Sequence, residues 1–275
     1  NKENIPLILL NARLTKKTFN RWIKIKFFSK SIFNKIKIAY PQNLETKKFL
    51  KNLNIKKINQ IGNLKFAQNN NVNQNRISDK LKLQLKGKKT WVASSTHVGE
   101  EIFCAEAHVI LKRKVKNIIT IIIPRHVHRV NEIAAEIRKL NLKIALHSKK
   151  IKNLEGVDIY LVDTFGETNI FHQIGATVFL GGSITKRGGQ NPLEAARYGA
   201  KILHGPNIDN FKDVYKLLKK LKISKKITTS KQLASLVTFN KNKKIGIKIK
   251  NIGENILKKT IKELDNLINN EFEKT

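Results

Sequence analysis

The 275-residue sequence contains no methionine, only five prolines and a single cysteine. The lone Cys104 cannot form an internal disulfide, which favours a reducing compartment. Because position 1 is asparagine rather than methionine, we expect further sequence upstream. The longest apolar runs fall well short of the roughly 20 residues of a membrane span, and no secretory signal leads the chain. The sequence therefore predicts a protein that is soluble or peripheral to a membrane.

Acidic residues are also scarce, with 20 Asp and Glu against 55 Lys and Arg, for a formal net charge of +35. Such a charge predicts anionic partners, such as nucleic acid, a phospholipid surface or a phosphorylated substrate. Most of the excess is lysine and accompanies many Asn and Ile residues, so a general compositional bias explains it as well. Arginine is scarce and no zinc-finger or RNP-like pattern occurs, so we expect no specific nucleic-acid partner.

Apolar runs typical of buried strands alternate with helical patterns along the whole chain. The first series has strands at Ile5–Leu10, Ile36–Tyr40 and Ile58–Ile61, with helices at Thr15–Phe28 and Leu44–Leu53. The second has strands at Thr90–Ser94, Asn117–Ile123, Leu142–His147, Val157–Val162, Ala176–Leu180, Ile202–Leu203 and near Ile227, with helices at Glu100–Leu111, Val127–Leu140, Asn210–Lys220 and from Ser230 onward. This alternation predicts an α/β protein with parallel sheets. We expect two domains, residues 1–65 and 66–275, and a linker or loop over the polar tract Gln68–Lys80.

The stretch Gly181–Glu194, GGSITKRGGQNPLE, follows a predicted strand and leads into a helix. Asn191 is placed as the N-cap, Pro192 as the first helical residue, and Glu194 three residues after the cap. Four glycines allow positive φ angles, and free backbone N–H groups at a helix N-terminus suit a phosphate or carboxylate. The alternative is a tight turn whose glycines only permit packing, and the glycine pattern leaves both interpretations open.

Ligands of parallel sheets collect at the carboxyl ends of the strands. Four polar loops therefore converge on one edge: Ser94 to His97, Pro124 to His126, Asp163 to Glu167, and Gly181 to Glu194. Arginine can bind phosphate there, and a carboxylate can accept from ribose hydroxyls. Histidines are too scattered to suggest a metal site, and no P-loop or GxSxG motif occurs. The residues alone predict a two-domain α/β protein with a nucleotide-like anion site in its second domain.

Several motifs, in this order and spacing, resemble those of the 3-deoxy-D-manno-octulosonic acid (Kdo) transferases of lipid A biosynthesis. They are Asn11-Ala12-Arg13, Gly62-Asn63-Leu64-Lys65, Ser94–Glu101, Pro124-Arg125-His126, Val162–Glu167, Gly181-Gly182-Ser183, Gly188–Ala196, Gly205-Pro206 and Asn210-Phe211. The resemblance covers nearly the whole chain.

The resemblance implies an α/β fold of GT-B type, with two Rossmann-like domains, the first one incomplete. It implies an inverting, metal-independent glycosyltransferase without a cofactor, which transfers Kdo from CMP-Kdo to the lipid A precursor at the cytoplasmic face of the bacterial inner membrane. Carried over by position, the donor-binding residues are Ser95, Thr96, His97, Gly99, Pro124, Arg125, His126, Phe165, Gly166, Glu167, Ser183, Gly188, Gly189, Asn191 and Glu194.

Two departures from the family pattern affect the expected chemistry. Gln190 replaces a usual histidine and lacks its titratable group. The resemblance also begins part-way through the family's first domain, so no general base is assigned, and we expect this chain alone to bind donor weakly or not at all and to transfer no sugar. Alternatives are a GT-B enzyme for another nucleotide sugar, a basic nucleic-acid-binding protein, and an inactive fragment. The basic helix Thr15–Phe28 either packs into a core or lies on anionic lipid.

Overall fold

The computed structural model describes residues 5–67, 77–151 and 153–272 and divides into two compact units. The first combines Asn1–Asn69 with Lys250–Thr275, and the second is Asn70–Ile249. The predicted second domain spanned residues 66–275, whereas here residues 250–275 group with the first unit. Most of the predicted linker Gln68–Lys80 lies outside the described residues, and its end forms the start of a helix at Asp79.

The first unit is built on two parallel strands, β1 (Leu7–Ala12) and β2 (Ile36–Pro41). The helices α1 (Lys16–Lys24) and α2 (Lys26–Phe33) connect them, and α3 (Leu44–Asn52) follows β2. Their apolar faces form a core of Ala12, Phe33, Ile36, Ala39, Leu50, Leu53 and Ile55. The side chain of Asn11 accepts a hydrogen bond from Leu64 N at 3.1 Å. That bond joins two stretches, 11–13 and 62–65, that carry the family resemblance.

Two predictions for this unit are wrong. The strand expected at Ile58–Ile61 is only a single bridge between Ile58 and Ala39, because the chain leaves the sheet toward Gly62, whose φ is 139°. The helix expected over Thr15–Phe28 is interrupted at Ile25, whose φ and ψ of −108° and 51° end α1. Apolar patterning does not locate such a break.

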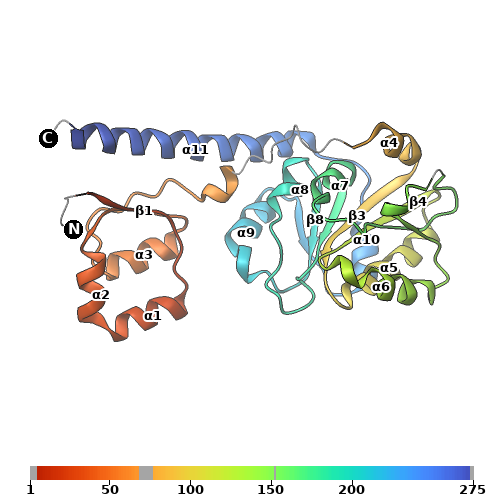
Figure 1. Ribbon diagram of the computed structural model, residues 1–275, viewed down its shortest axis with the longest axis horizontal. Helices are drawn as coiled ribbons and strands as arrows, with labels where there is room; N and C mark the ends of the chain where they lie inside the picture. Colours follow the sequence, from red (N-terminus) through yellow and green to blue (C-terminus); the bar gives the residue numbers. More distant parts are fainter. Residues whose placement is uncertain (1–4, 68–76, 152, 273–275) are drawn as a thin grey trace. The chain divides into compact units, whose positions relative to one another are not determined.

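The second unit contains a seven-stranded parallel sheet with the order β5-β6-β4-β3-β7-β8-β9 (Figure 1). Its strands are β3 (Lys89–Thr96), β4 (Ile118–Pro124), β5 (Ile144–Leu146), β6 (Ile159–Leu161), β7 (Thr177–Leu180), β8 (Lys201–His204) and β9 (Ser224–Lys226). Its helices are α4 (Asp79–Leu85), α5 (Glu100–Lys112), α6 (Val130–Arg138), α7 (Thr168–Ile174), α8 (Leu193–Arg197), α9 (Lys212–Lys220) and α10 (Ser230–Leu236), and α11 (Lys243–Phe272) runs from this unit into the first. The predicted parallel α/β architecture is confirmed.

The direction of the chain through this sheet reverses at β3. From β3 the chain moves outward through β4 to the edge strand β5 and comes back to β6, which lies between β5 and β4. It then passes through α7 to β7 on the other side of β3. Right-handed crossovers therefore place α5 and α6 on one face and α7, α8 and α9 on the other (Figure 1). Open α/β sheets bind ligands at such a reversal, outside the carboxyl ends of the strands. β3 continues to Thr96, two residues beyond the predicted strand end, so the loop after it is His97–Gly99. The glycine stretch that begins at Gly181 follows β7 as predicted.

Candidate functional site

The loops after β3 and β7 are in close backbone contact. Strand β3 has an irregularity in its pairing at Ser95, whose φ is 55°, and Gly181 N donates to Ser94 O at 2.9 Å. A Cβ atom on Gly181 would overlap the carbonyl oxygen of Ser95 and lie 2.6 Å from the Cα of Thr96. Glycine is therefore required at position 181 by this close approach, as the packing interpretation of the glycine pattern proposed.

Glu100, the first residue of α5, is fully buried and holds the glycine loop. Its carboxylate accepts hydrogen bonds from the backbone N–H groups of Gly182 at 2.7 Å, Ser183 at 3.1 Å and Ile184 at 2.9 Å. It also accepts from His97 N at 2.9 Å, within its own turn. The N–H groups of Gly182, Ser183 and Ile184, which the anion-site interpretation left free for a ligand, are therefore bonded to an internal carboxylate instead.

The rest of the glycine loop is fixed by further internal bonds. The buried hydroxyl of Ser183 donates to Leu180 O at 2.5 Å and accepts from Gly205 N at 2.8 Å, and Gly189 N donates to Gly182 O at 2.8 Å. The side chain of Asn191 accepts from Leu193 N at 3.1 Å, although the helix begins one residue later than predicted. Because α8 has only five residues, side chains must supply most of the charge that a ligand would meet here.

Cationic and imidazole groups gather beside this loop. The ring of His97 lies 5.7 Å from that of His126, measured between centroids, and the backbone N–H of Arg125 donates to Thr96 O at 2.9 Å. Burial is the main cause that lowers the pKa of His97. The carboxylate of Glu100 opposes this shift, and His126, Arg187 and Arg125 add to it. A neutral His97 leaves the guanidinium groups as the permanent charges of this edge.

Within the described part of the chain, the buried Nε2 atom of His97 has no hydrogen-bond partner. The guanidinium of Arg125 likewise forms no ion pair with any carboxylate that the structure describes. A buried polar atom without a partner beside an unneutralised guanidinium is suited to an anionic, hydrogen-bonding ligand.

The remaining predicted residues flank this cluster. Phe165 is 81% exposed, and Gly166 has a φ of 86°. Glu167 accepts from the Thr164 hydroxyl and lies 3.1 Å from His147 Nε2, at one side of a pocket of about 450 Å³ that is also lined by Ser148, Lys150 and Tyr160. Burial raises the pKa of Glu194. A carboxyl group with a raised pKa in a half-buried position suits hydrogen bonding to hydroxyl groups.

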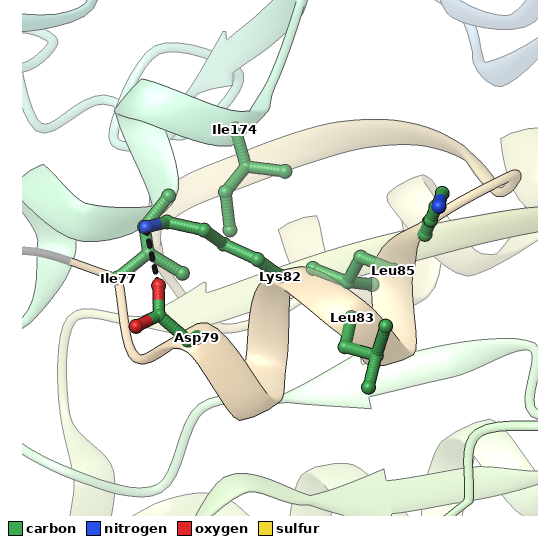
Figure 2. Close-up of a pocket in the computed structure, with 7 residues that line it drawn as sticks. Ile77, Asp79, Lys82, Leu83, Leu85 and Ile174 are labelled. Carbon is green, nitrogen blue, oxygen red and sulfur yellow. Dashed lines mark hydrogen bonds and ion pairs between the residues drawn. The ribbon is translucent and has the colours of Figure 1, made fainter.

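A separate pocket lies between α4 and Ile174 of α7 (Figure 2). It has a volume of about 430 Å³, and Lys82 Nζ lies 2.8 Å from Asp79 Oδ1 at its rim. Its described lining is Ile77, Asp79, Lys82, Leu83, Leu85, Lys86 and Ile174. None of these is a predicted donor-binding residue, so the pocket is not the candidate site.

Among residues 5–67, 77–151 and 153–272, no three His, Cys, Asp or Glu side chains come together in a way that could hold a metal ion. The buried thiol of Cys104 lies beside Glu100 and Glu101. Burial, followed by these two carboxyl groups, raises its pKa well above the ordinary value. A thiol held in its protonated form is a poor nucleophile.

Comparison with known proteins decides the family. Residues 1–68 match the family model described as 3-Deoxy-D-manno-octulosonic-acid transferase (kdotransferase). The curated 3-deoxy-D-manno-octulosonic acid transferase of Rickettsia prowazekii is 34% identical over 254 residues, which are 92% of this chain and 54% of the relative. The chain belongs to the Kdo transferase family. It spans about half the length of the curated relatives it matches.

Solved structures agree with the fold. The C-terminal CMP-Kdo binding domain of WaaA from Acinetobacter baumannii matches with a TM-score of 0.54 and 20% identity, over 64% of this chain and 93% of that domain. The E. coli trehalose-6-phosphate protein bound with UDP-2-fluoro glucose matches with a TM-score of 0.52 and 10% identity, over 96% of this chain and 69% of that one. The predicted GT-B class is confirmed, while the predicted roles of individual site residues stay predictions.

His172 lies beneath this site, and we expect it to make the second unit sensitive to acid. It is buried in α7, its Nε2 lies 3.0 Å from Ser94 Oγ, and burial lowers its pKa to about 3. Since the unfolded chain takes up the proton near pH 6.5, the free energy of unfolding should fall by about 2 kcal/mol between pH 8 and pH 5 on this account. Urea unfolding across this range should show a shallower pH dependence for His172→Asn. If the free energy of unfolding depended on pH equally in both proteins, His172 would not be the cause, because the other histidines are common to both.

Proposed function

We propose that the second unit of this chain binds the cytidine nucleotide of CMP-Kdo, and that the chain serves Kdo transfer to the lipid A precursor in lipopolysaccharide synthesis. The observation that carries the proposal is the meeting of the loops after β3 and β7 at the reversal point of the sheet, in a chain related to Kdo transferases. The unneutralised Arg125 and the unpartnered His97 Nε2 support an anionic ligand there.

In the proposed reaction the bond between the anomeric carbon and the CMP phosphate oxygen breaks, and an acceptor hydroxyl attacks from the opposite face. Charge develops on the departing phosphate, so Arg125 would stabilise the transition state more than the bound donor. His97 Nε2 would hydrogen-bond the phosphate, Glu194 the ribose, and the exposed Phe165 would cover the base. We assign no general base and no metal to the described residues, and the transfer is proposed to be inverting.

Nucleotide titration tests the proposed donor. We expect the chain to bind CMP weakly, in the high micromolar to millimolar range that is typical of an isolated half-site, and UMP at least tenfold more weakly. Arg125→Ala should weaken CMP binding about tenfold, since a charge-assisted bond is lost. The matched control Arg138→Ala, which removes an exposed arginine from α6, should bind as the unsubstituted chain does. Equal binding of UMP would point to another nucleotide sugar. Similar binding of CMP and of generic RNA, with equal losses in Arg125→Ala and Arg138→Ala, would indicate nonspecific electrostatic binding.

We also propose that the first unit attaches to the anionic cytoplasmic surface of the inner membrane. Phe27 is 92% exposed and Phe28 57%, next to the exposed Ile23 and Ile25. Residues 5–44 include nine Lys and Arg but neither Asp nor Glu. Apolar side chains among lysines suit the boundary of an anionic bilayer. No helix in the described ranges combines the length and apolar character that a membrane crossing needs.

Vesicle co-sedimentation tests this surface. We expect binding to vesicles that contain phosphatidylglycerol and little binding to neutral phosphatidylcholine vesicles. Phe27→Ser should reduce binding to the anionic vesicles several-fold, because an aromatic side chain is no longer buried in the interface. Leu44→Ser, which removes another exposed apolar side chain of the same unit from α3, is the matched control and should have no effect. Equal binding to neutral vesicles, or equal loss in both variants, would refute the proposal.

A further inference from the structure

Arg187 lies in the glycine loop next to the candidate site, yet neither the family motifs nor the loop pattern assign it a role. A Cβ atom on Gly182 would lie 3.3 Å from the Cβ of Arg187 and 3.2 Å from Nε2 of His97. Arg187 and the imidazole therefore flank the same glycine. Through His126, whose ring lies 5.7 Å from that of His97, the cluster continues to the loop that carries Arg125.

The backbone of Arg187 is held, whereas its side chain is uncommitted. Its N–H donates to Thr185 O at 2.8 Å, and its carbonyl accepts from the side chain of Asn210 at 3.2 Å. In the part of the chain that the structure describes, the guanidinium makes no hydrogen bond and no ion pair. A fixed backbone with a free guanidinium is a preorganised position for binding an anion.

The buried carboxylate of Glu100 explains why a side chain, rather than the backbone of the loop, is needed to bind a phosphate here. Glu100 already accepts from the N–H groups of Gly182, Ser183 and Ile184, so these donors cannot also bind a phosphate. The carboxylate also adds negative charge directly behind the loop, which opposes an anionic ligand. A cation close to the loop offsets this repulsion, and Arg187 adjoins Gly182.

We infer that Arg187 is a second phosphate-binding arginine of the donor site, beside Arg125, and that it replaces the backbone N–H groups of the glycine loop in this role. The inference rests on the proposed function, since it takes the ligand to be a cytidine nucleotide. The phosphate would then be bound by the guanidinium groups of Arg125 and Arg187 rather than by backbone N–H groups of the glycine loop.

Two ligands and two variants test this role. CMP and cytidine differ only in the phosphate, and Lys186 offers an adjacent exposed cation in the same loop. NMR titrations of the whole chain should show that Arg187→Ala weakens CMP binding about tenfold, as expected for loss of a charge-assisted bond. Cytidine binding should change less than twofold. Lys186→Ala should change CMP binding less than threefold, because it removes one positive charge but leaves the guanidinium group of Arg187 in place.

Arg187 is exposed, so the substituted chain should retain the unfolding midpoint of the unsubstituted chain. The inference is overturned if Arg187→Ala binds CMP as the unsubstituted chain does, if Lys186→Ala loses as much, or if cytidine binding falls equally. Failure of the unsubstituted chain to bind CMP at all would instead overturn the proposed function, and the inference with it.

Discussion

Replacing Glu100 by glutamine should destabilise the second unit by about 3 kcal/mol and release the glycine loop. The carboxylate receives four backbone N–H groups at 2.7–3.1 Å, three of them from Gly182, Ser183 and Ile184. An amide has one acceptor oxygen, and its NH₂ group would face N–H donors that have no other partner. Buried donors left unsatisfied cost 1–3 kcal/mol each before relaxation.

Two measurements report the effect of Glu100→Gln. The chain has two tryptophans, Trp22 in the first unit and Trp91 in the second, so in a Trp22→Phe background fluorescence reports unfolding of the second unit. Trypsin cleavage after Lys186 or Arg187 should accelerate at least tenfold in Glu100→Gln, since the loop that carries them loses its anchor. Glu106→Gln, an exposed position of the same helix, should leave both readouts unchanged. An unchanged rate of loop cleavage in Glu100→Gln would contradict the anchoring role.

Replacing Gly181 by alanine should have an effect of similar size through backbone contact. The added Cβ would overlap Ser95 O and lie 2.6 Å from Thr96 Cα, and neither backbone atom can move without opening β3. The loops after β3 and β7 must then separate. We expect a loss of about 3 kcal/mol, at the upper end of overpacking costs, together with loss of detectable CMP binding.

Gly87→Ala is the control for this substitution. Gly87 has a φ of 77° and open space around its Cβ position, in the turn that precedes β3. Alanine there costs only backbone strain, about 1 kcal/mol, and leaves the candidate site intact. If Gly181→Ala retains CMP binding while losing no more stability than Gly87→Ala, the two loops do not have the close contact described above.

The architecture of the second unit could be predicted because its signals are local and redundant. The run at 118–123 is apolar at nearly every position, as a central parallel strand requires, and β4 is buried throughout. Alternating strands and helices impose a parallel sheet, and a parallel sheet brings the polar ends of its strands to one edge. The predicted loops after β3 and β7 meet for this reason.

Features that depend on contacts distant in sequence were not predicted. Glu100 bonds to N–H groups 82 to 84 residues away, and a glutamate in the first turn of a helix is ordinary without that partner. The seven-residue helices α4 and α7 are too short for a periodic signal. The run at 58–61 resembles a strand locally, but it has no partner beyond Ala39 among the described residues.

Hydrogen–deuterium exchange with and without saturating CMP tests whether the loops after β3 and β7 bind the nucleotide. We expect slower exchange in peptides that cover residues 95–99, 124–126 and 183–191, with residues 7–53 of the first unit unchanged. UMP at the same concentration should protect little. CMP binding at these loops would be refuted if CMP altered exchange nowhere, or if it protected only the lysine-rich helices of the first unit and left the loops after β3 and β7 as they are in the free chain.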